Sequence, residues 1–387
     1  MPVVTISRKG EERVQAGHPW VYRSDVQQVD GAVAGDIVRV EGPRGRPLGF
    51  AFFSTRSEIA VRMVAGPGEE PSADFWRTRI TAAAAYRESL RFDATAYRVV
   101  YGEADRLPSL IVDRYGDHLV VQALSQAVDR ALPAITHALV DVLQPAGILA
   151  RNDPRVRLLE GLEQRVEALY GTVPEAIDVR EGAVEYRVDP WRGQKTGLFL
   201  DQRENREAAL RYARGRALDA FSYNGGFALA IAPRCEHVTA IDISADAVAR
   251  IRTNAAHNGR ANVEAREMNV FDEMRELQRT GAQFDTIVLD PPAFAKNKAA
   301  VRKALSGYKE INLRAIKLLR PGGVLVTCSC SYNVSESMFV DIVSDAAADA
   351  RAEVTLVEKR TQGRDHPILL NVPETYYLKC LILRKVA

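Results

Sequence analysis

Cysteine is scarce in this 387-residue chain, which has four cysteines and no CxxC pair. None of the six histidines lies near the cysteines at a spacing typical of metal ligands. Disulfide scaffolds belong mainly to small secreted domains, whereas a chain of this length can bury its own cores. The sequence therefore predicts neither a disulfide framework nor a metal site, and it leaves the cysteines as core residues or nucleophiles: Cys235, Cys328, Cys330 and Cys380.

Long apolar runs and an excess of one charge are also missing. No stretch approaches the ~20 apolar residues that a membrane helix needs. The first five residues, Met1 to Thr5, have neither the basic start nor the apolar core of a signal peptide. Lys and Arg number 52 and Asp and Glu 50, a balance that neither demands nor excludes a nucleic-acid partner. We expect a cytoplasmic protein with no membrane partner.

Turn-rich and linker-like stretches divide the chain into three predicted domains. Residues 1–68 have the pattern of a small β domain, with short alternating runs and a Gly- and Pro-rich turn. Residues 73–188 have the pattern of a separate α+β domain after a linker. The predicted elements are strands at 36–41 and 58–63, a helix over 73–90, strands at 109–113 and 118–123, a helix over roughly 128–143 and a strand at 147–151.

The third predicted domain, residues 189–387, alternates strands with helices. This alternation is typical of a parallel, doubly wound α/β sheet. One helix is expected to begin after Ser244 as N-cap and to stop at Asn258-Gly259. The predicted strands are 217–221, 238–242, 263–268, 284–290, 323–329, 354–358 and 376–384.

The first strand of this domain leads into a glycine-containing loop, Asp219-Ala-Phe-Ser-Tyr-Asn-Gly-Gly-Phe227. Its two glycines allow a tight turn and a close approach of the backbone to a ligand. The next strand ends at Asp242, which lies about 20 residues after the loop, the distance at which a carboxylate binds ribose hydroxyls. Because the loop is not GxGxxG, it favours an adenosyl ligand without phosphates over a dinucleotide.

The third and fourth strands end in further polar residues. Asn269 follows the third strand, where a side-chain oxygen could accept from an adenine amino group. The fourth strand ends in Asp290-Pro-Pro-Ala-Phe294. Consecutive prolines stop a central strand, so this exit should direct the Asp290 carboxylate and the Phe294 ring toward the ligand crevice.

The fifth strand ends in two thiols, Cys328 and Cys330. Its apolar body is typical of a buried strand, whereas its tip carries reactive groups. Both thiols fall on the same side if the strand continues. Periodicity alone therefore does not separate a nucleophile from a core cysteine.

These motifs resemble the class I S-adenosylmethionine (SAM)-dependent methyltransferases, and more narrowly the bacterial RlmI-type 23S rRNA cytosine methyltransferases. The resemblance rests on 219–226, Asp242, Asp290-Pro-Pro and Ser329-Cys330-Ser331, in that order. It extends over essentially the whole chain, because the residues around 8–22 are similar to the family's RNA-binding PUA domain and those at 365–379 to its C-terminal pattern. It implies a PUA-like β-barrel, a central α+β domain and a Rossmann-like catalytic domain. It also implies a 23S rRNA partner and a homodimer.

The resemblance selects Cys330 as the nucleophile, with Asp290 as its catalytic partner. The chain departs from the family pattern at Asn269, where an Asp is frequent, and at Cys328, where the family often has another residue. The implied SAM-binding residues are Phe221, Ser222, Tyr223, Gly225, Asp242, Ile243, Asn269, Val270 and Asp290, together with Lys195, Thr196 and Asp201 from a segment that closes over the cofactor in the family; the expected RNA-binding residues are Pro292, Phe294, Lys296 and Arg302.

Cytosine chemistry independently requires such a cysteine. Carbon-5 is a poor nucleophile until a thiolate adds at carbon-6, which breaks the aromaticity of the ring. Two alternatives stay open. An exocyclic-nitrogen methyltransferase acting on RNA or DNA would use the Asp-Pro-Pro loop and need no cysteine, and a non-catalytic RNA-binding or assembly protein would retain only the fold. A nicotinamide dehydrogenase is disfavoured by the missing GxGxxG.

Overall fold

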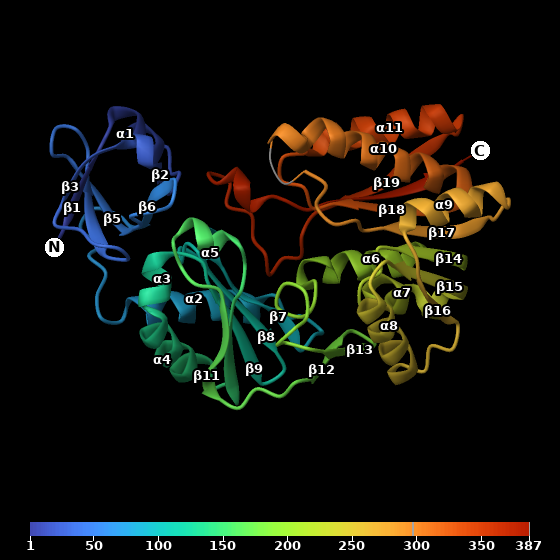
Figure 1. The fold of residues 1–387 in the computed structure, drawn as a ribbon, viewed down its shortest axis with the longest axis horizontal. Helices are drawn as coiled ribbons and strands as arrows, with labels where there is room; N and C mark the ends of the chain where they lie inside the picture. The colour runs from blue at the N-terminus through green and yellow to red at the C-terminus, as the bar shows by residue number, and fades with distance from the viewer. Residues whose placement is uncertain (296–297, 387) are drawn as a thin grey trace. The chain divides into compact units, whose positions relative to one another are not determined.

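The computed structural model describes residues 1–295 and 298–386, which form two compact units (Figure 1). The first unit consists of residues 1–179, 188–197 and 364–375. The second consists of residues 180–187, 198–363 and 376–387. Each unit therefore includes segments that are far apart in the sequence.

The first unit begins with a six-stranded sheet in the order β2-β6-β5-β4-β1-β3. The strands predicted at 36–41 and 58–63 are confirmed as β4 and β6. A short helix, α1, was not expected; Ser7 caps it by accepting from Gly10 N at 3.1 Å. The elements are β1 Val3–Ile6, α1 Arg8–Gln15, β2 Trp20–Tyr22, β3 Val26–Asp30, β4 Ile37–Glu41, β5 Pro47–Phe53 and β6 Ile59–Ala65.

A five-stranded sheet in the order β11-β10-β9-β8-β7 follows in the same unit. The helix predicted at 128–143 is wrong in one respect, because it is two helices that meet at Ala131. Pro133 explains the break, since proline has no N–H to continue the first helix but fits the first turn of the second. The elements are α2 Phe75–Ser89, β7 Ala96–Tyr101, β8 Leu110–Tyr115, β9 His118–Ala123, α3 Gln126–Arg130, α4 Leu132–Leu143, β10 Gly147–Asn152, α5 Val156–Leu159 and β11 Arg165–Gly171.

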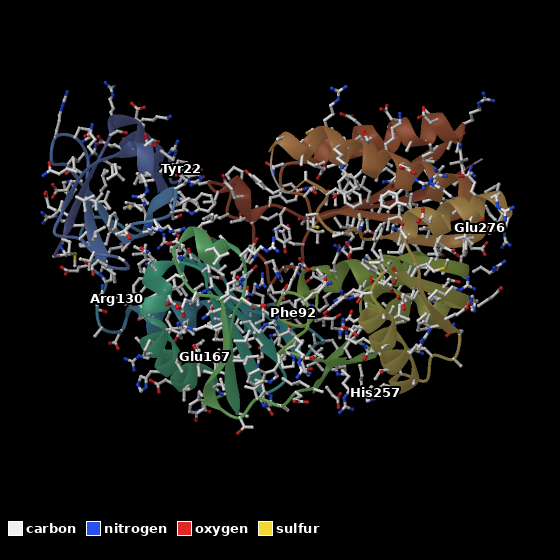
Figure 2. The ribbon with its side chains drawn as sticks, viewed as in Figure 1. Tyr22, Phe92, Arg130, Glu167, His257 and Glu276 are labelled. Atoms are coloured by element: carbon white, nitrogen blue, oxygen red, sulfur yellow. The ribbon has the colours of Figure 1, made fainter. Side chains whose placement is uncertain are left out.

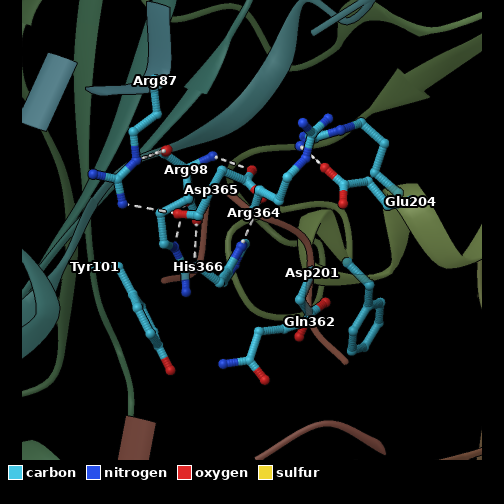
Figure 3. Close-up of polar contacts among 12 residues, drawn as sticks. Arg87, Arg98, Tyr101, Asp201, Glu204, Gln362, Arg364, Asp365 and His366 are labelled. Carbon is cyan, nitrogen blue, oxygen red and sulfur yellow. Dashed lines mark hydrogen bonds and ion pairs between the residues drawn. The ribbon is translucent and has the colours of Figure 1, made fainter. Parts of the chain in front are cut away.

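Residues 364–375 belong to the first unit although the sequence around them belongs to the second. Asp365 fixes this segment: its carboxylate accepts from Arg98 N at 3.0 Å and its carbonyl accepts from Arg87 at 2.8 Å (Figure 3). His366 lies 3.0 Å from the Asp365 carboxylate and packs on the Tyr101 ring. These contacts give His366 a structural role.

The second unit contains a seven-stranded sheet in the order β16-β15-β14-β17-β18-β20-β19. All seven predicted strands are present, with ends shifted by up to about four residues. The expectation of a parallel sheet is wrong for β20, which pairs antiparallel with both β18 and β19. The β19–β20 connection contains only a short 3-10 turn at Pro373–Thr375, and a parallel return needs a crossover such as a helix. The strands are β14 Gly215–Ala220, β15 Cys235–Asp242, β16 Val263–Glu267, β17 Phe284–Leu289, β18 Leu319–Ser329, β19 Val354–Arg360 and β20 Lys379–Lys385.

Helices cover both faces of this sheet (Figure 1). Leu218, Ile287 and Leu325 pack into one core with α9, α10 and α11, and Val238, Val288 and Val326 into another with α6, α7 and α8. The predicted helix after Ser244 is confirmed as α8, which ends at His257 (Figure 2). The remaining elements are the hairpin β12 Ile177–Glu181 and β13 Val184–Val188, and the helices α6 Arg203–Tyr212, α7 Gly226–Ile231, α8 Ala245–His257, α9 Val270–Arg279, α10 Val301–Leu318 and α11 Glu336–Ala350.

Candidate active site

The loop between β14 and α7 has an unusual backbone. Phe221, Tyr223 and Gly225 all have positive φ, at 66°, 53° and 87°. For the two aromatic residues this conformation is strained, and such strain concentrates at functional sites. Ser222 N donates to Ile241 O at 2.9 Å, so the loop is anchored to the end of β15. The contact of this loop with the adenosyl ligand stays a prediction.

Asp219, near the end of β14, holds this loop by hydrogen bonds. Its carboxylate is buried and accepts from Ser222 Oγ at 2.5 Å and from Ala228 N at 2.9 Å. Burial raises the pKa of Asp219 to about 7, and the nearby Asp290 and Asp242 carboxylates add to the rise. The hydrogen bonds from Ser222 and Ala228 act in the opposite direction.

This raised pKa has a testable consequence for stability. Because the folded state binds the Asp219 proton more tightly than the unfolded state, the contribution of Asp219 should fall as pH rises from about 4 to about 7. In Asp219→Asn, the amide oxygen can accept the same hydrogen bonds but the side chain does not titrate. The pH-dependent contribution of residue 219 to the stability should therefore disappear. As pH rises from about 4 to about 7, the unfolding temperature of the wild type should therefore fall relative to that of the variant. Thermal unfolding of both proteins across this pH range is the measurement. A constant difference would contradict the raised pKa.

Asp242 is oriented by two backbone amides. One carboxylate oxygen accepts from Tyr223 N and the other from Ser244 N, both at 2.9 Å. The adjacent Ile243 side chain is 67% exposed, a large value for an apolar residue at the end of a strand. An oriented carboxylate beside an open apolar side chain fits a ribose and an adenine ring, so the residues present suit SAM.

Asn269 and Val270 begin α9. The Asn269 Oδ1 atom caps this helix by accepting from Phe271 N at 2.9 Å, and Val270 is buried. The contact between the Asn269 oxygen and adenine stays a prediction, and the capping bond occupies part of that oxygen's capacity.

Gln202 is a residue that the sequence reasoning missed. It is buried, and its Nε2 donates to Asp290 Oδ1 at 2.8 Å. Asn205 donates to Gln202 Oε1 at 2.7 Å, which fixes the orientation of the amide. Gln202 lies directly after Asp201, whose carboxylate accepts from Tyr377 at 2.6 Å. The sequence signal for Gln202 was its position in the segment that closes over the cofactor in the family. Its partner, Asp290, lies some ninety residues further along the chain, so no local pattern links the two.

Loss of the Gln202 bond should impair catalysis more than cofactor binding. In Gln202→Leu we expect single-turnover methyl transfer to slow by about 10- to 100-fold, because a hydrogen bond to a charged group contributes roughly 1.5–3 kcal/mol. SAM affinity measured by calorimetry should change little. The matched control is Gln278→Leu, at an exposed glutamine of α9, and equal rates in both variants would contradict a positioning role.

Lys195 and Thr196 belong to the first unit, whereas the other predicted cofactor residues belong to the second. Thr196 is buried, and its hydroxyl donates to Asp113 Oδ2 at 2.7 Å and contacts Tyr115 at 2.9 Å. Lys195 has a φ of 53°. Their role in cofactor binding stays a prediction.

The two candidate thiols lie in different surroundings. Cys328 is fully buried within β18 and pairs across the ladder with Cys380 of β20. Burial raises the pKa of Cys328 well above its usual value, and Cys380 adds to the rise. Cys330 follows the end of β18, is half-buried, and its Sγ lies 3.7 Å from Pro291 O. A fully buried neutral thiol is inert, so this difference supports Cys330 as the nucleophile.

The residues expected to contact RNA differ in their exposure to solvent. Pro292 and Arg302 are exposed, whereas Lys296 lies outside the described residues. Phe294 is half-buried among aromatic rings, with its centroid 4.7 Å from that of Tyr308 and 6.4 Å from that of Phe221. The Phe294 ring therefore has a packing role beside any contact with a substrate.

Comparison with known proteins identifies the family of this chain. A family of S-adenosylmethionine-dependent methyltransferases matches residues 108–384, and a PUA-like domain matches residues 4–65. Two relatives named ribosomal RNA large subunit methyltransferase I, from Tolumonas auensis and Aeromonas hydrophila, are 39% and 40% identical. The alignments cover 99% and 97% of this chain and 99% and 98% of the relatives. The chain belongs to this family of SAM-dependent methyltransferases.

Solved structures show the same fold. A candidate SAM-dependent methyltransferase from Streptococcus mutans has a TM-score of 0.85 at 20% identity, over 99% of this chain and 100% of that one. Another, complexed with SAH, has a TM-score of 0.86 at 21% identity over the same shares. The family's cofactor is SAM.

In the part of the chain that the structure describes, no helix has the length and apolar character to cross a membrane.

Proposed function

We propose that this protein methylates carbon-5 of a cytosine in 23S rRNA, through a covalent adduct with Cys330. Relatives that match over almost their full length are named large-subunit rRNA methyltransferases. The observation that carries the carbon-5 assignment is the half-buried Cys330 thiol, 3.7 Å from the carbonyl that follows Asp290. A methyltransferase acting on an exocyclic nitrogen has no use for a thiol at this position.

In this mechanism the Cys330 thiolate forms a bond to carbon-6, and the electron pair of the 5,6 double bond makes carbon-5 nucleophilic. SAM would supply the methyl group from its positive sulfur: carbon-5 forms a bond to the methyl, the methyl–sulfur bond breaks with its electron pair on sulfur, and neutral S-adenosylhomocysteine leaves. A base then removes the carbon-5 proton. The electron pair left behind restores the double bond while the bond between carbon-6 and Cys330 Sγ breaks. Asp290, held by Gln202, contacts the ring nitrogen or amino edge and stabilises the adduct.

The RNA is expected to contact the residues after Asp290 and the start of α10. Pro292 and Arg302 are exposed there, and Arg302 is suited to a phosphate. The PUA-like domain would add contacts of its own. Such contacts would make affinity fall with salt. We place the reaction in the cytoplasm, where ribosomal RNA of bacteria is found.

The experiment that tests this function is a map of 5-methylcytosine in ribosomal RNA from cells with and without the protein. We expect one or a few 23S positions to lose the mark and to regain it with the wild-type gene but not with Cys330→Ala. An unchanged map would overturn the assignment.

A further inference from the structure

The second unit contains a buried lysine close to the candidate nucleophile. Lys379 begins β20 and is only 2% exposed. Lysine is almost never buried to this extent without partners, because its charge must leave water. Its Nζ donates to Ser331 O at 2.7 Å and to Tyr377 O at 2.9 Å. The ammonium is therefore bound to the residue that directly follows Cys330.

Ser331 fixes the turn that carries the thiol. It is fully buried, and its Oγ accepts from Ala295 N at 3.2 Å and contacts Tyr308 Oη at 3.0 Å. Its carbonyl accepts from Val334 N as well as from Lys379. Cys330 is thus held between the end of β18 and a residue tied to several elements.

Two described groups close to Cys330, the Pro291 carbonyl and the Tyr308 hydroxyl, do not favour a thiolate. The Pro291 carbonyl accepts a hydrogen bond from the Cys330 thiol, which favours the neutral thiol. Burial raises the pKa of Tyr308, so its hydroxyl stays neutral at physiological pH. A cation close to the thiol would act in the opposite direction and favour the thiolate.

Lys379 has the position and charge to do so. Burial lowers the pKa of Lys379 to about 8, while the charges of Cys330 and Glu336 act to raise it. Because charge interactions are reciprocal, an ammonium at this position would favour the anionic over the neutral form of Cys330. Glu336, on α11, is already paired with Lys359 at 2.9 Å and with Tyr376 at 2.8 Å.

We propose that Lys379 is a positioning residue whose buried ammonium both fixes the turn that carries Cys330 and stabilises the Cys330 thiolate. This inference rests on the proposed function for its meaning, because only a nucleophilic Cys330 needs the anionic form. It extends the site to β20, which no sequence motif connects to the thiol.

The test is the pH dependence of Cys330 alkylation by iodoacetamide in the full-length protein, followed by mass spectrometry of the Cys330 peptide. In Lys379→Met we expect the midpoint of the rate profile to rise by about one pH unit, and the rate at pH 7 to fall about tenfold. Lys379→Gln keeps N–H donors for the two carbonyls but has no charge, so it should show the same shift. The plateau rate at high pH should be unchanged.

The matched control is Lys385→Met, at the other end of β20, where Nζ also donates to two carbonyls, Ile316 O at 3.1 Å and Leu319 O at 2.8 Å. It should leave the profile unchanged. A lower plateau without a shifted midpoint in Lys379→Gln would mean that Lys379 only shapes the turn, and it would overturn the proposal. Because alkylation requires no RNA, this result is independent of whether Cys330→Ala abolishes methylation, so the two proposals can fail separately.

Discussion

Cys330→Ala should lose methyl transfer by at least about 10⁴-fold, the order observed when a covalent nucleophile is removed. Without the thiol, carbon-5 has no route to become nucleophilic, and Cys328 does not replace it, because Cys328 is fully buried beside Cys380. The measurement is transfer of labelled methyl to rRNA under single-turnover conditions. SAM binding by calorimetry should persist, which separates a chemical defect from a folding defect.

Cys328→Ala is the matched control. It removes a thiol two residues earlier in the chain, inside β18, and the cost should appear as a lower unfolding temperature with activity retained. RNA containing 5-fluorocytidine gives a second measurement, because fluorine at carbon-5 cannot leave as a proton does and the adduct should persist. The trapped complex should form with wild type and with Cys328→Ala but not with Cys330→Ala. Full turnover by Cys330→Ala would favour an exocyclic-nitrogen methyltransferase instead.

Asp242→Ala should weaken SAM binding by about 100-fold or more. The carboxylate is proposed to bind the ribose hydroxyls, and it also accepts from Tyr223 N and Ser244 N, so its removal frees the strained loop at 221–225. Hydrogen bonds to a charged group contribute roughly 1.5–3 kcal/mol each, which sets this magnitude. Calorimetric titration with SAM is the measurement.

The control for this variant is Asp246→Ala, at an exposed carboxylate in the first turn of the same helix, α8. It should leave the dissociation constant within about threefold. Asp242→Asn keeps one acceptor oxygen and should give an intermediate loss. Equal affinities of Asp242→Ala and Asp246→Ala would exclude Asp242 from the cofactor site.

Local pattern was enough to find most of the secondary structure of the second unit. Alternating strands and helices gave all seven strands, and Ser244 with Asn258-Gly259 gave both ends of α8. The break at Ala131 was missed because a single proline in the first turn of a helix does not disturb the apolar pattern. The reversal of β20 was missed because strand direction depends on the connection, not on the residues within the strand.

The sequence by itself determined the family and most of the strands of the second unit, because these depend on motifs and patterns of residues that are close together in the chain. Periodicity did not separate Cys328 from Cys330, and the preference for Cys330 came from the family resemblance; the tertiary structure adds a physical reason for it. Alternation places both on one face, and both contact the same core, but Cys328 lies within β18 opposite Cys380 of β20, whereas Cys330 follows the end of the strand. The contacts of Gln202 with Asp290 and of Lys379 with Ser331 were decided by folding, since each joins segments that no local pattern relates.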